Sequence, residues 1–314
     1  MLDTKEMRAV YCEALLEEMK QDARIVVLEA DLMGASGTKP VQDACPDRLI
    51  NVGVAEANMV STAAGMSACG KIPVCDTFAA FLSRRDYDQI FISVAYAGLN
   101  VKLVGTDPGV SAEHNGGTHM PFEDVGILRG IPTMTILEPA DTVQLKKALP
   151  VILHSYGPVY MRLYRKCPHR LYDDDYQFEL GKADQLRDGR DLSIIASGMM
   201  VWNALQAAEI LETEGIHARV LNMHTIKPID VEAISRAARE TGAIVTAENH
   251  SILNGLGSAV AETLCENDLF VPLQRVGVRD LFGDVGTADY LMERFGLSVS
   301  AITKAARETA ARKH

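Results

Sequence analysis

The sequence predicts an α/β protein made of two doubly wound domains, each with a mostly parallel sheet. Short apolar runs, rich in β-branched residues, alternate with helical patterns along the 314 residues, and this succession is typical of βα units. The alternation breaks once, at the polar stretch 166–190, and then restarts. Because one domain takes about 100–200 residues, the length suits two. We therefore expect domains at 1–170 and 191–314, joined by a linker at 171–190.

In the first domain, apolar residues at helical spacing open the chain, and each later helix follows a short apolar run. The predicted helices are 5–21, 56–70, 84–98, 123–130 and 140–157. The predicted strands are 23–32, the start of 72–81, 100–107, 133–139 and 158–165. The run ARIVVLEADL at 23–32 is β-branched and ends in acids, which is typical of a strand buried on both faces of a parallel sheet.

The second domain repeats this pattern after the polar stretch. Its predicted strands are 191–198, 217–228, 243–250 and 272–278, and its predicted helices are 199–215, 230–242, 255–267 and the tail. The stretch between the domains contains the acidic run Asp173–Asp175. A solvated turn explains this run better than a metal site, because polar charge runs are typical of linkers.

Composition excludes several classes of protein. A net charge of −11, from 31 Lys and Arg against 42 Asp and Glu, argues against nonspecific binding to nucleic acid or membranes. No apolar run approaches the roughly 18 residues of a membrane span, and the acidic N-terminal helix pattern is unlike a signal peptide. The six cysteines lack C-x-x-C spacing, as expected of free thiols in a reducing compartment. We expect a soluble, cytoplasmic protein.

The loop TDPGVSAEHNGGTHMP, at 106–121, is the first candidate site. It follows an apolar strand, and ligands of open α/β sheets bind beyond the carboxyl ends of strands. Its glycines allow a close backbone approach to a ligand, and Pro121 restrains the neighbouring His119. A polar surface loop is the alternative interpretation.

Five further residues carry possible chemistry. Glu56 ends an apolar run and opens a helix of small residues. Desolvation there would raise its pKa and suit proton exchange with a ring nitrogen, although an acid beside a helix dipole is an equal alternative. Phe78 and Phe81 suit either stacking on a heterocycle or core packing. Arg162 and Arg165 end a strand and suit either an anionic ligand or internal ion pairs.

Six segments, in order and at family spacing, resemble the transketolase family. They are ADL (30–32), RLINVGVAEANM (48–59), DTFAAFLSRRDYDQI (76–90), GGTHMPFED (116–124), ILRGIPTMTILEPAD (127–141) and GPVYMRLYR (157–165). The resemblance covers essentially the whole chain. It implies a pyrimidine-binding domain to about residue 170, followed by a transketolase C-terminal domain. This arrangement is that of the C-terminal subunit of a split transketolase.

The resemblance also implies roles in a thiamine diphosphate site. Glu56 corresponds to the glutamate that hydrogen-bonds N1′ of the aminopyrimidine and so activates the cofactor. Phe78 and Phe81 correspond to aromatic residues lining the pyrimidine pocket, which favours stacking over core packing. Asp31 matches a cofactor-pocket aspartate, and Arg84, which stands where some members have an aromatic residue, is expected to contact the cofactor.

For the substrate, the resemblance implies a sugar-phosphate site. His119 matches the substrate-binding histidine and, with Glu56, is the expected catalytic residue, while His114 lies nearby on the same loop. Arg8 and Arg165 match the arginines that hold the sugar phosphate. Asn115 stands where the family usually has an aspartate that contacts the donor sugar. The implied reaction is transfer of a two-carbon ketol unit from a ketose phosphate to an aldose phosphate in pentose phosphate metabolism.

The family's G-D-G pattern with a following Asn, which holds the diphosphate and Mg²⁺, is absent from the sequence. The resemblance therefore implies a partner N-terminal subunit carrying that domain, no metal ligands here, and an α₂β₂ heterotetramer. The alternatives are a related thiamine enzyme, such as a 1-deoxyxylulose-5-phosphate synthase-like or specialised sugar-phosphate transketolase, a 2-oxo-acid dehydrogenase β subunit, and a catalytically silent regulatory subunit.

Overall fold

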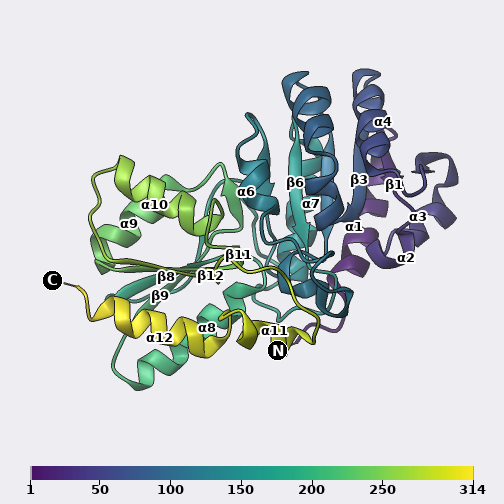
Figure 1. Ribbon diagram of the computed structural model, residues 1–314. Coiled ribbons are helices and arrows are strands. Elements are labelled where there is room, and N and C mark those ends of the chain that lie inside the picture. The colour runs from purple at the N-terminus through teal and green to yellow at the C-terminus, as the bar shows by residue number, and fades with distance from the viewer. Residues whose placement is uncertain (1, 314) are drawn as a thin grey trace.

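The computed structural model describes residues 2–313 and forms two α/β domains (Figure 1). The strands of the first domain are β1 (Ile25–Glu29), β2 (Leu49–Asn51), β3 (Ile72–Phe78), β4 (Lys102–Thr106), β5 (Thr135–Leu137) and β6 (Val159–Leu163). Those of the second are β7 (Asp184–Arg187), β8 (Leu192–Ala196), β9 (Ala218–Asn222), β10 (Thr225–Lys227), β11 (Ile244–Ser251) and β12 (Leu273–Val278).

Two sheets organise these strands. The first has seven strands in the order β10-β5-β6-β4-β3-β1-β2, and the second has five in the order β12-β11-β8-β9-β7. All neighbours pair in parallel except β10 with β5 and β7 with β9, which lie at sheet edges. Two doubly wound, mostly parallel sheets confirm the predicted fold class. Strand β10 comes from the second half of the chain but completes the first sheet.

Helices cover both faces of each sheet. In the first domain they are α1 (Met7–Gln21), α2 (Met33–Ser36), α3 (Lys39–Ala44), α4 (Glu56–Ala68), α5 (Ala79–Arg84), α6 (Asp124–Arg129) and α7 (Thr142–His154), with short or irregular helices η1 (Pro46–Arg48), η2 (Gln89–Tyr96) and η3 (Gly109–Asn115). In the second they are α8 (Met200–Thr213), α9 (Val231–Thr241), α10 (Leu256–Glu266), α11 (Ala288–Arg294) and α12 (Val299–Ala310).

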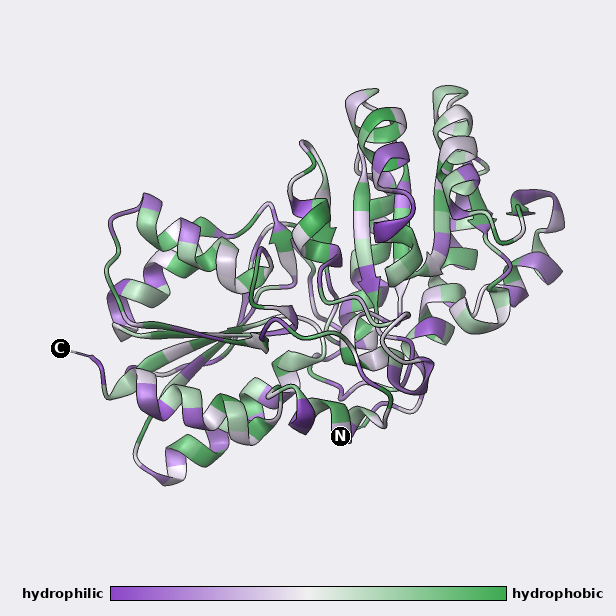
Figure 2. Cartoon of the chain, viewed as in Figure 1, coloured by the Kyte–Doolittle hydropathy of each residue, from purple (hydrophilic) through white to green (hydrophobic). Residues whose placement is uncertain are grey.

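The core lies between each sheet and its helices. Every residue of β1, β3, β4 and β6 is buried, because parallel strands covered on both faces have no solvent-facing side. Helices α1 and α7 pack on one face of the first sheet, and α4 and η2 on the other. In Figure 1, α9 and α10 lie above the second sheet and α8 and α12 below it. Figure 2 shows hydrophobic residues along much of the strands and hydrophilic residues on both helices and loops.

Several predicted boundaries differ from the structure. Most of the predicted helix 84–98 is the π-helix η2, because the preceding α-helix α5 begins at Ala79 and already ends at Arg84. The predicted strand 217–228 divides into β9 and β10, because the chain leaves the second sheet after β9 to pair with β5. The predicted linker, 171–190, contains the edge strand β7, so part of it belongs to the second sheet.

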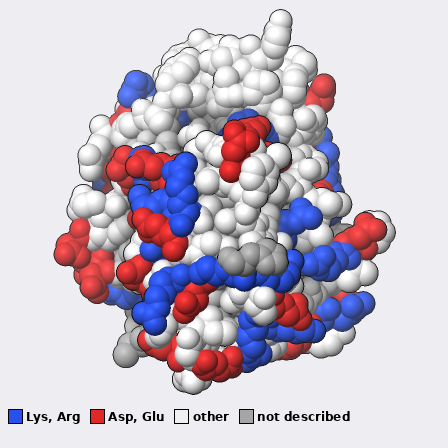
Figure 3. Space-filling model, turned by 90° about the vertical axis from the view of Figure 1, so that its left-hand side faces the viewer, with Lys and Arg blue, Asp and Glu red and all other residues white. Residues whose placement is uncertain are grey.

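Two predictions made for the whole chain can also be compared with the structure. All six cysteines have free thiols, as predicted. Within residues 2–313 no helix has the length and hydropathy needed to cross a bilayer. Figure 3 looks at the end of the molecule formed by the C-terminal domain, where acidic and basic side chains are interleaved. The negative net charge is therefore not gathered into one patch on this face.

Candidate active site

Glu56 lies at the centre of the candidate site. It is the first residue of α4, follows the apolar β2 segment, and is only 4% exposed. Nη1 of Arg85 donates a hydrogen bond of 2.8 Å to Oε1 of Glu56. The same guanidinium lies 4.0 Å from the ring centroid of Phe81. Glu56 is thus both a helix-terminal acid and a buried, cation-paired carboxylate.

A second buried carboxyl group, Asp86, lies beside this pair. It follows α5, is fully buried, and neither of its oxygens has a hydrogen-bond partner among the described residues. Burial raises its pKa to about 8, helped by the negative charge of Glu56 and opposed by Arg85. The neighbourhood of Glu56 therefore holds a carboxyl group that stays protonated at neutral pH.

Phe78, Phe81 and His119 form one aromatic cluster. The ring centroids of Phe78 and Phe81 are 5.7 Å apart, and His119 lies 5.6 Å from Phe78 and 5.0 Å from Phe81. All three contacts are edge-to-face, the geometry that the ring quadrupoles favour. Since Arg85 links Phe81 to Glu56, four residues chosen from the sequence meet in one place.

The loop that carries His119 is held by Arg84. The Arg84 guanidinium pairs with Glu123 and donates hydrogen bonds to the backbone carbonyls of Thr118, at 3.2 Å, and Met120, at 3.5 Å. Nδ1 of His119 lies 2.8 Å from Oγ1 of Thr118, and this hydrogen bond restrains the orientation of the His119 ring. Arg84 was predicted to contact the cofactor. The structure shows it bracing the loop around His119.

Asp31 is positioned by a residue that the sequence analysis did not select. Asp31 follows β1 with φ of +64°, a left-handed conformation that Asp tolerates better than most residues. Oδ1 of Asn51 accepts from the Asp31 amide at 3.0 Å, and Nδ2 of Asn51 donates to Oδ1 of Asp31 at 3.2 Å. Asn51 lies in the family-like segment RLINVGVAEANM, but the pattern alone gives no sign of this bridge.

Arg8 and Arg165, the two arginines predicted to hold the sugar phosphate, are neighbours along their backbones, and each guanidinium group has an acidic partner. The Arg8 amide donates to the carbonyl of Arg165 at 3.4 Å. Nε of Arg165 lies 3.1 Å from Oδ1 of Asp107, and Nε of Arg8 lies 2.7 Å from Oε2 of Glu6. Burial raises the pKa of Asp107 to about 6, against the attraction of Arg165 and Arg8. Asp107 opens the candidate loop and was not selected from the sequence.

His114 and Asn115 lie between these two groups in the same loop. Both are exposed in η3, and neither side chain makes a hydrogen bond within residues 2–313. Because Asp107 contacts Arg165 at the start of the loop and His119 reaches the aromatic pair at its end, the loop spans the distance between the two clusters.

Arg162 does not belong to the site. It is fully buried, with Nε 2.8 Å from Oδ2 of Asp124 and Nη1 2.9 Å from Oε1 of Glu138. It also donates to the carbonyl of Asn249 in β11, at 2.9 Å. Of the two sequence-based alternatives for this arginine, internal ion pairing is confirmed. Arg162 ties the two domains together.

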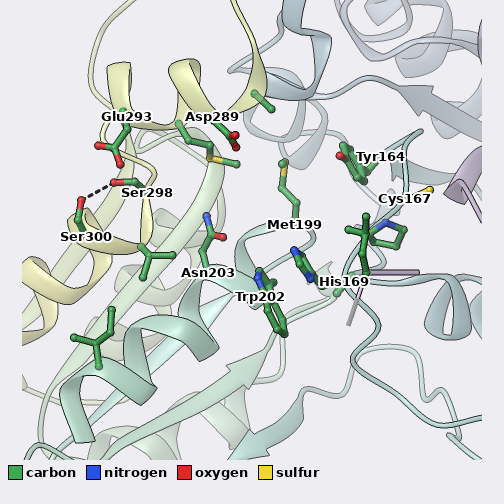
Figure 4. A pocket seen from close by; sticks show the side chains of 17 residues that line it. Tyr164, Cys167, His169, Met199, Trp202, Asn203, Asp289, Glu293, Ser298 and Ser300 are labelled. Atoms are coloured by element: carbon green, nitrogen blue, oxygen red, sulfur yellow. Dashed lines mark hydrogen bonds between the residues drawn. The ribbon is translucent and has the colours of Figure 1, made fainter. Parts of the chain in front are cut away.

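A cavity of about 640 Å³ lies elsewhere, between the two domains (Figure 4). The ring of His169 stacks on Trp202 with centroids 4.0 Å apart. Met199, Met292 and the start of α12 complete much of its wall. None of the predicted site residues lines this cavity. Within residues 2–313 no group of three or more His, Cys, Asp or Glu side chains has an arrangement suited to a metal ion.

Comparison with known proteins agrees with this organisation. Residues 3–168 match the transketolase pyrimidine binding domain, and residues 181–302 match the transketolase C-terminal domain. The chain is 56% identical over 313 residues to a 6-deoxy-6-sulfo-D-fructose transketolase subunit, SqwH, of Clostridium sp. (strain MSTE9), covering 100% of this chain and 97% of the relative. It is 39% identical over 303 residues to one subunit of the apulose-4-phosphate transketolase of Phocaeicola vulgatus, covering 96% of each.

A solved structure extends the likeness to three dimensions. A split gene transketolase, described as an inactive beta4 tetramer, superposes with a TM-score of 0.91 at 39% identity, covering 99% of this chain and 100% of that one. The chain belongs to the transketolase family. Within that family it is the C-terminal subunit of a split transketolase. The resemblance seen in the sequence is therefore confirmed.

The cluster around Glu56 fits the cofactor on which this family depends, thiamine diphosphate. A buried carboxylate suits a ring nitrogen that exchanges a proton, and the paired rings of Phe78 and Phe81 suit a flat heterocycle. Asp86 has two unpartnered buried oxygens near that carboxylate. These residues fit the aminopyrimidine end of the cofactor.

Proposed function

We propose that this subunit transfers a two-carbon ketol unit from a ketose to an aldose at the cluster of Glu56, Phe78, Phe81 and His119. The single observation that carries the proposal is the meeting of His119 with the aromatic pair, 5.0 Å from Phe81, beside the buried Glu56 and its partner Arg85. A catalytically silent subunit would not need a buried carboxylate, whose desolvation is costly, at this place.

In this proposal Glu56 holds a proton at the ring nitrogen of the pyrimidine. Arg85 orients the Glu56 carboxylate through the 2.8 Å hydrogen bond, while Phe78 and Phe81 pack against the ring. Bound thiamine diphosphate supplies the electron sink for breaking the carbon–carbon bond beside the ketose carbonyl. His119, oriented through Thr118, donates a hydrogen bond to substrate oxygens. Asp31 lines the cofactor pocket, and His114 and Asn115 face the sugar.

We propose further that the diphosphate and Mg²⁺ are held by an N-terminal partner subunit in an α₂β₂ assembly. The structural relative made of β chains alone is described as inactive, and the sequence relatives are named as subunits. Symmetric closure favours two copies of each chain. Free thiols throughout the chain are typical of a reducing compartment and support a cytoplasmic location.

The substrates are proposed to be sugars with an anionic group at the end remote from the ketol unit. One relative is named for 6-deoxy-6-sulfo-D-fructose and another for apulose-4-phosphate, so the named anions are a sulfonate and a phosphate. The backbones of Arg8 and Arg165 are neighbours, and their guanidinium groups are the proposed hydrogen-bond donors to either anion. Sugar phosphates, as in pentose phosphate metabolism, and sugar sulfonates both satisfy this description.

Replacing Glu56 tests the proposal. Reconstituted with its partner subunit, Glu56→Gln is expected to lose at least about 100-fold in kcat, since positioned proton transfer contributes about 10²–10⁴-fold. Glu17→Gln, at a position 56% exposed and remote from the cluster, is the matched control and should retain full activity. Full activity of the Glu56 variant, or ketol transfer by this chain alone, would contradict the proposal.

A further inference from the structure

Asp107 is an unusual neighbour for a sugar-anion site. It follows β4, is 1% exposed, and has φ of +55°. Neither of its carboxylate oxygens accepts a hydrogen bond from a described residue. Its one close cationic contact among those residues is Nε of Arg165, 3.1 Å from Oδ1. A buried carboxylate without hydrogen bonds is costly, so its presence beside Arg165 calls for a role.

Each cation of this cluster already has its own carboxylate. The ion pairs are Arg8 with Glu6, Arg165 with Asp107 and Lys166 with Glu113. The formal charges of the six side chains therefore sum to zero. Of the three acids only Asp107 is fully buried, and repulsion from a buried charge is the least screened by solvent and salt.

The two anions in question differ in charge. A phosphate monoester carries about −1.5 to −2 charges at pH 7, since its second pKa is about 6. A sulfonate carries a single negative charge at any physiological pH but also has three acceptor oxygens in a tetrahedral array. Because the six side chains together carry no net charge, the cluster has no surplus positive charge to balance a dianion. The buried Asp107 carboxylate therefore repels the singly charged sulfonate less than the phosphate.

We infer that Asp107 is a specificity residue, and that the site around Arg8 and Arg165 takes a sugar with a distal sulfonate in preference to one with a distal phosphate. The inference rests on the proposed ketol transfer and adds the charge of the donor's remote group. Arg8 and Arg165 donate to the sulfonate oxygens, and Asp107 holds Arg165 in place. A phosphate at the same position carries roughly twice the negative charge of a sulfonate, so the Asp107 carboxylate repels it more strongly.

Two donors of equal carbon skeleton test the inference. With the partner subunit present at pH 8, kcat/KM is measured for 6-deoxy-6-sulfofructose and for fructose 6-phosphate. Burial raises the pKa of Asp107 only to about 6, so its carboxylate is ionised in this assay. We expect the native protein to prefer the sulfonate by at least about tenfold. A preference for the phosphate would overturn the inference, and this result needs no variant.

Asp107→Asn supplies the second arm, because it keeps the size of the side chain and Asn tolerates positive φ. We expect the sulfonate-to-phosphate ratio of kcat/KM to fall at least about tenfold, through a lower KM for the phosphate. Asp43→Asn, at an exposed position, is the control and should leave the ratio unchanged. An unchanged ratio in Asp107→Asn would overturn the inference. If the native pair turned over neither donor, the proposed function would fail and this inference with it.

Discussion

Arg85 and Glu56 form an ion pair between an exposed guanidinium and a buried carboxylate. Nη1 of Arg85 lies 2.8 Å from Oε1 of Glu56, yet the Arg85 side chain is 50% exposed and that of Glu56 only 4%. The carboxylate is therefore buried, while its counter-ion is half exposed to solvent. The Arg85 guanidinium also covers the ring of Phe81 at 4.0 Å, so one side chain orients both the acid and an aromatic wall.

Replacing Arg85 by Met should weaken catalysis without unfolding the protein. The variant keeps much of the apolar contact with Phe81 but removes the hydrogen bond to Glu56. A hydrogen bond to a charged group is worth about 1.5–3 kcal/mol, which corresponds to a roughly 10- to 100-fold loss of kcat/KM. Steady-state kinetics of the reconstituted pair measures this. Arg307→Met, which breaks an exposed pair with Glu214, should behave like the native protein.

Replacing Arg84 by Ala should loosen the loop that carries His119. The variant loses the hydrogen bonds to the carbonyls of Thr118 and Met120. We expect kcat/KM to fall by about tenfold, and limited proteolysis to cut the loop 107–121 faster than in the native protein. Arg24→Ala, which removes an exposed pair with Asp22, is the control. Equal proteolysis of the Arg84 variant and the native protein would contradict a bracing role.

Replacing Arg162 by Met should destabilise the fold. Asp124 and Glu138 would remain buried without their cation, and breaking a buried pair in this way costs about 3–5 kcal/mol. The shift of the urea unfolding curve measures the loss. Arg162→Lys, which keeps the charge, should be less destabilised than Arg162→Met. A loss below about 1 kcal/mol for the Met variant would show that the buried network is dispensable.

Asp86 should make stability depend on pH. Its pKa is about 8 in the folded protein and about 3.9 in an unfolded chain. Between these values the folded state keeps a proton that the unfolded state has released, so stability falls as pH rises from about 4 to 8. Asp86→Asn removes this term and should match the native protein near pH 4.

At pH 8.5 Asp86→Asn should be more stable than the native protein by a few kcal/mol, since one pKa unit corresponds to about 1.36 kcal/mol. Urea unfolding at several pH values measures the difference. Asp173→Asn, in the exposed acidic run, should follow the native curve. A constant difference across the whole pH range would contradict the assignment to Asp86.

The order of helices and strands could be predicted because each buried parallel strand leaves a local apolar run, and most helices leave a 3.6-residue pattern. Two features left no such signal. The π-helix η2 has the same local pattern as an α-helix. Strand β10 is three residues long, and its partner β5 is distant in sequence, so nothing near Thr225 reveals that it crosses to the other sheet.

The site divides in a similar way. Glu56, Phe78 and His119 lie in segments that resemble the family, so the sequence alone selects them as candidates. Arg85, Asn51 and Asp107 act through contacts between segments that lie far apart, for example from Arg85 to Glu56 and from Arg165 to Asp107. A single sequence does not show such pairings, because it does not reveal which of the many acidic residues will lie near a given arginine in the folded protein.

The position of strand β10 limits how the chain can be divided into separately expressed fragments. It covers the open edge of β5 in the first sheet, although in the chain it comes directly after β9, which belongs to the second sheet. A fragment cut after β6 would expose the backbone amides and carbonyls of β5, and unpaired strand edges are templates for aggregation. The boundary between the two halves in sequence is therefore not a boundary between independently soluble units, since the second half finishes the sheet of the first.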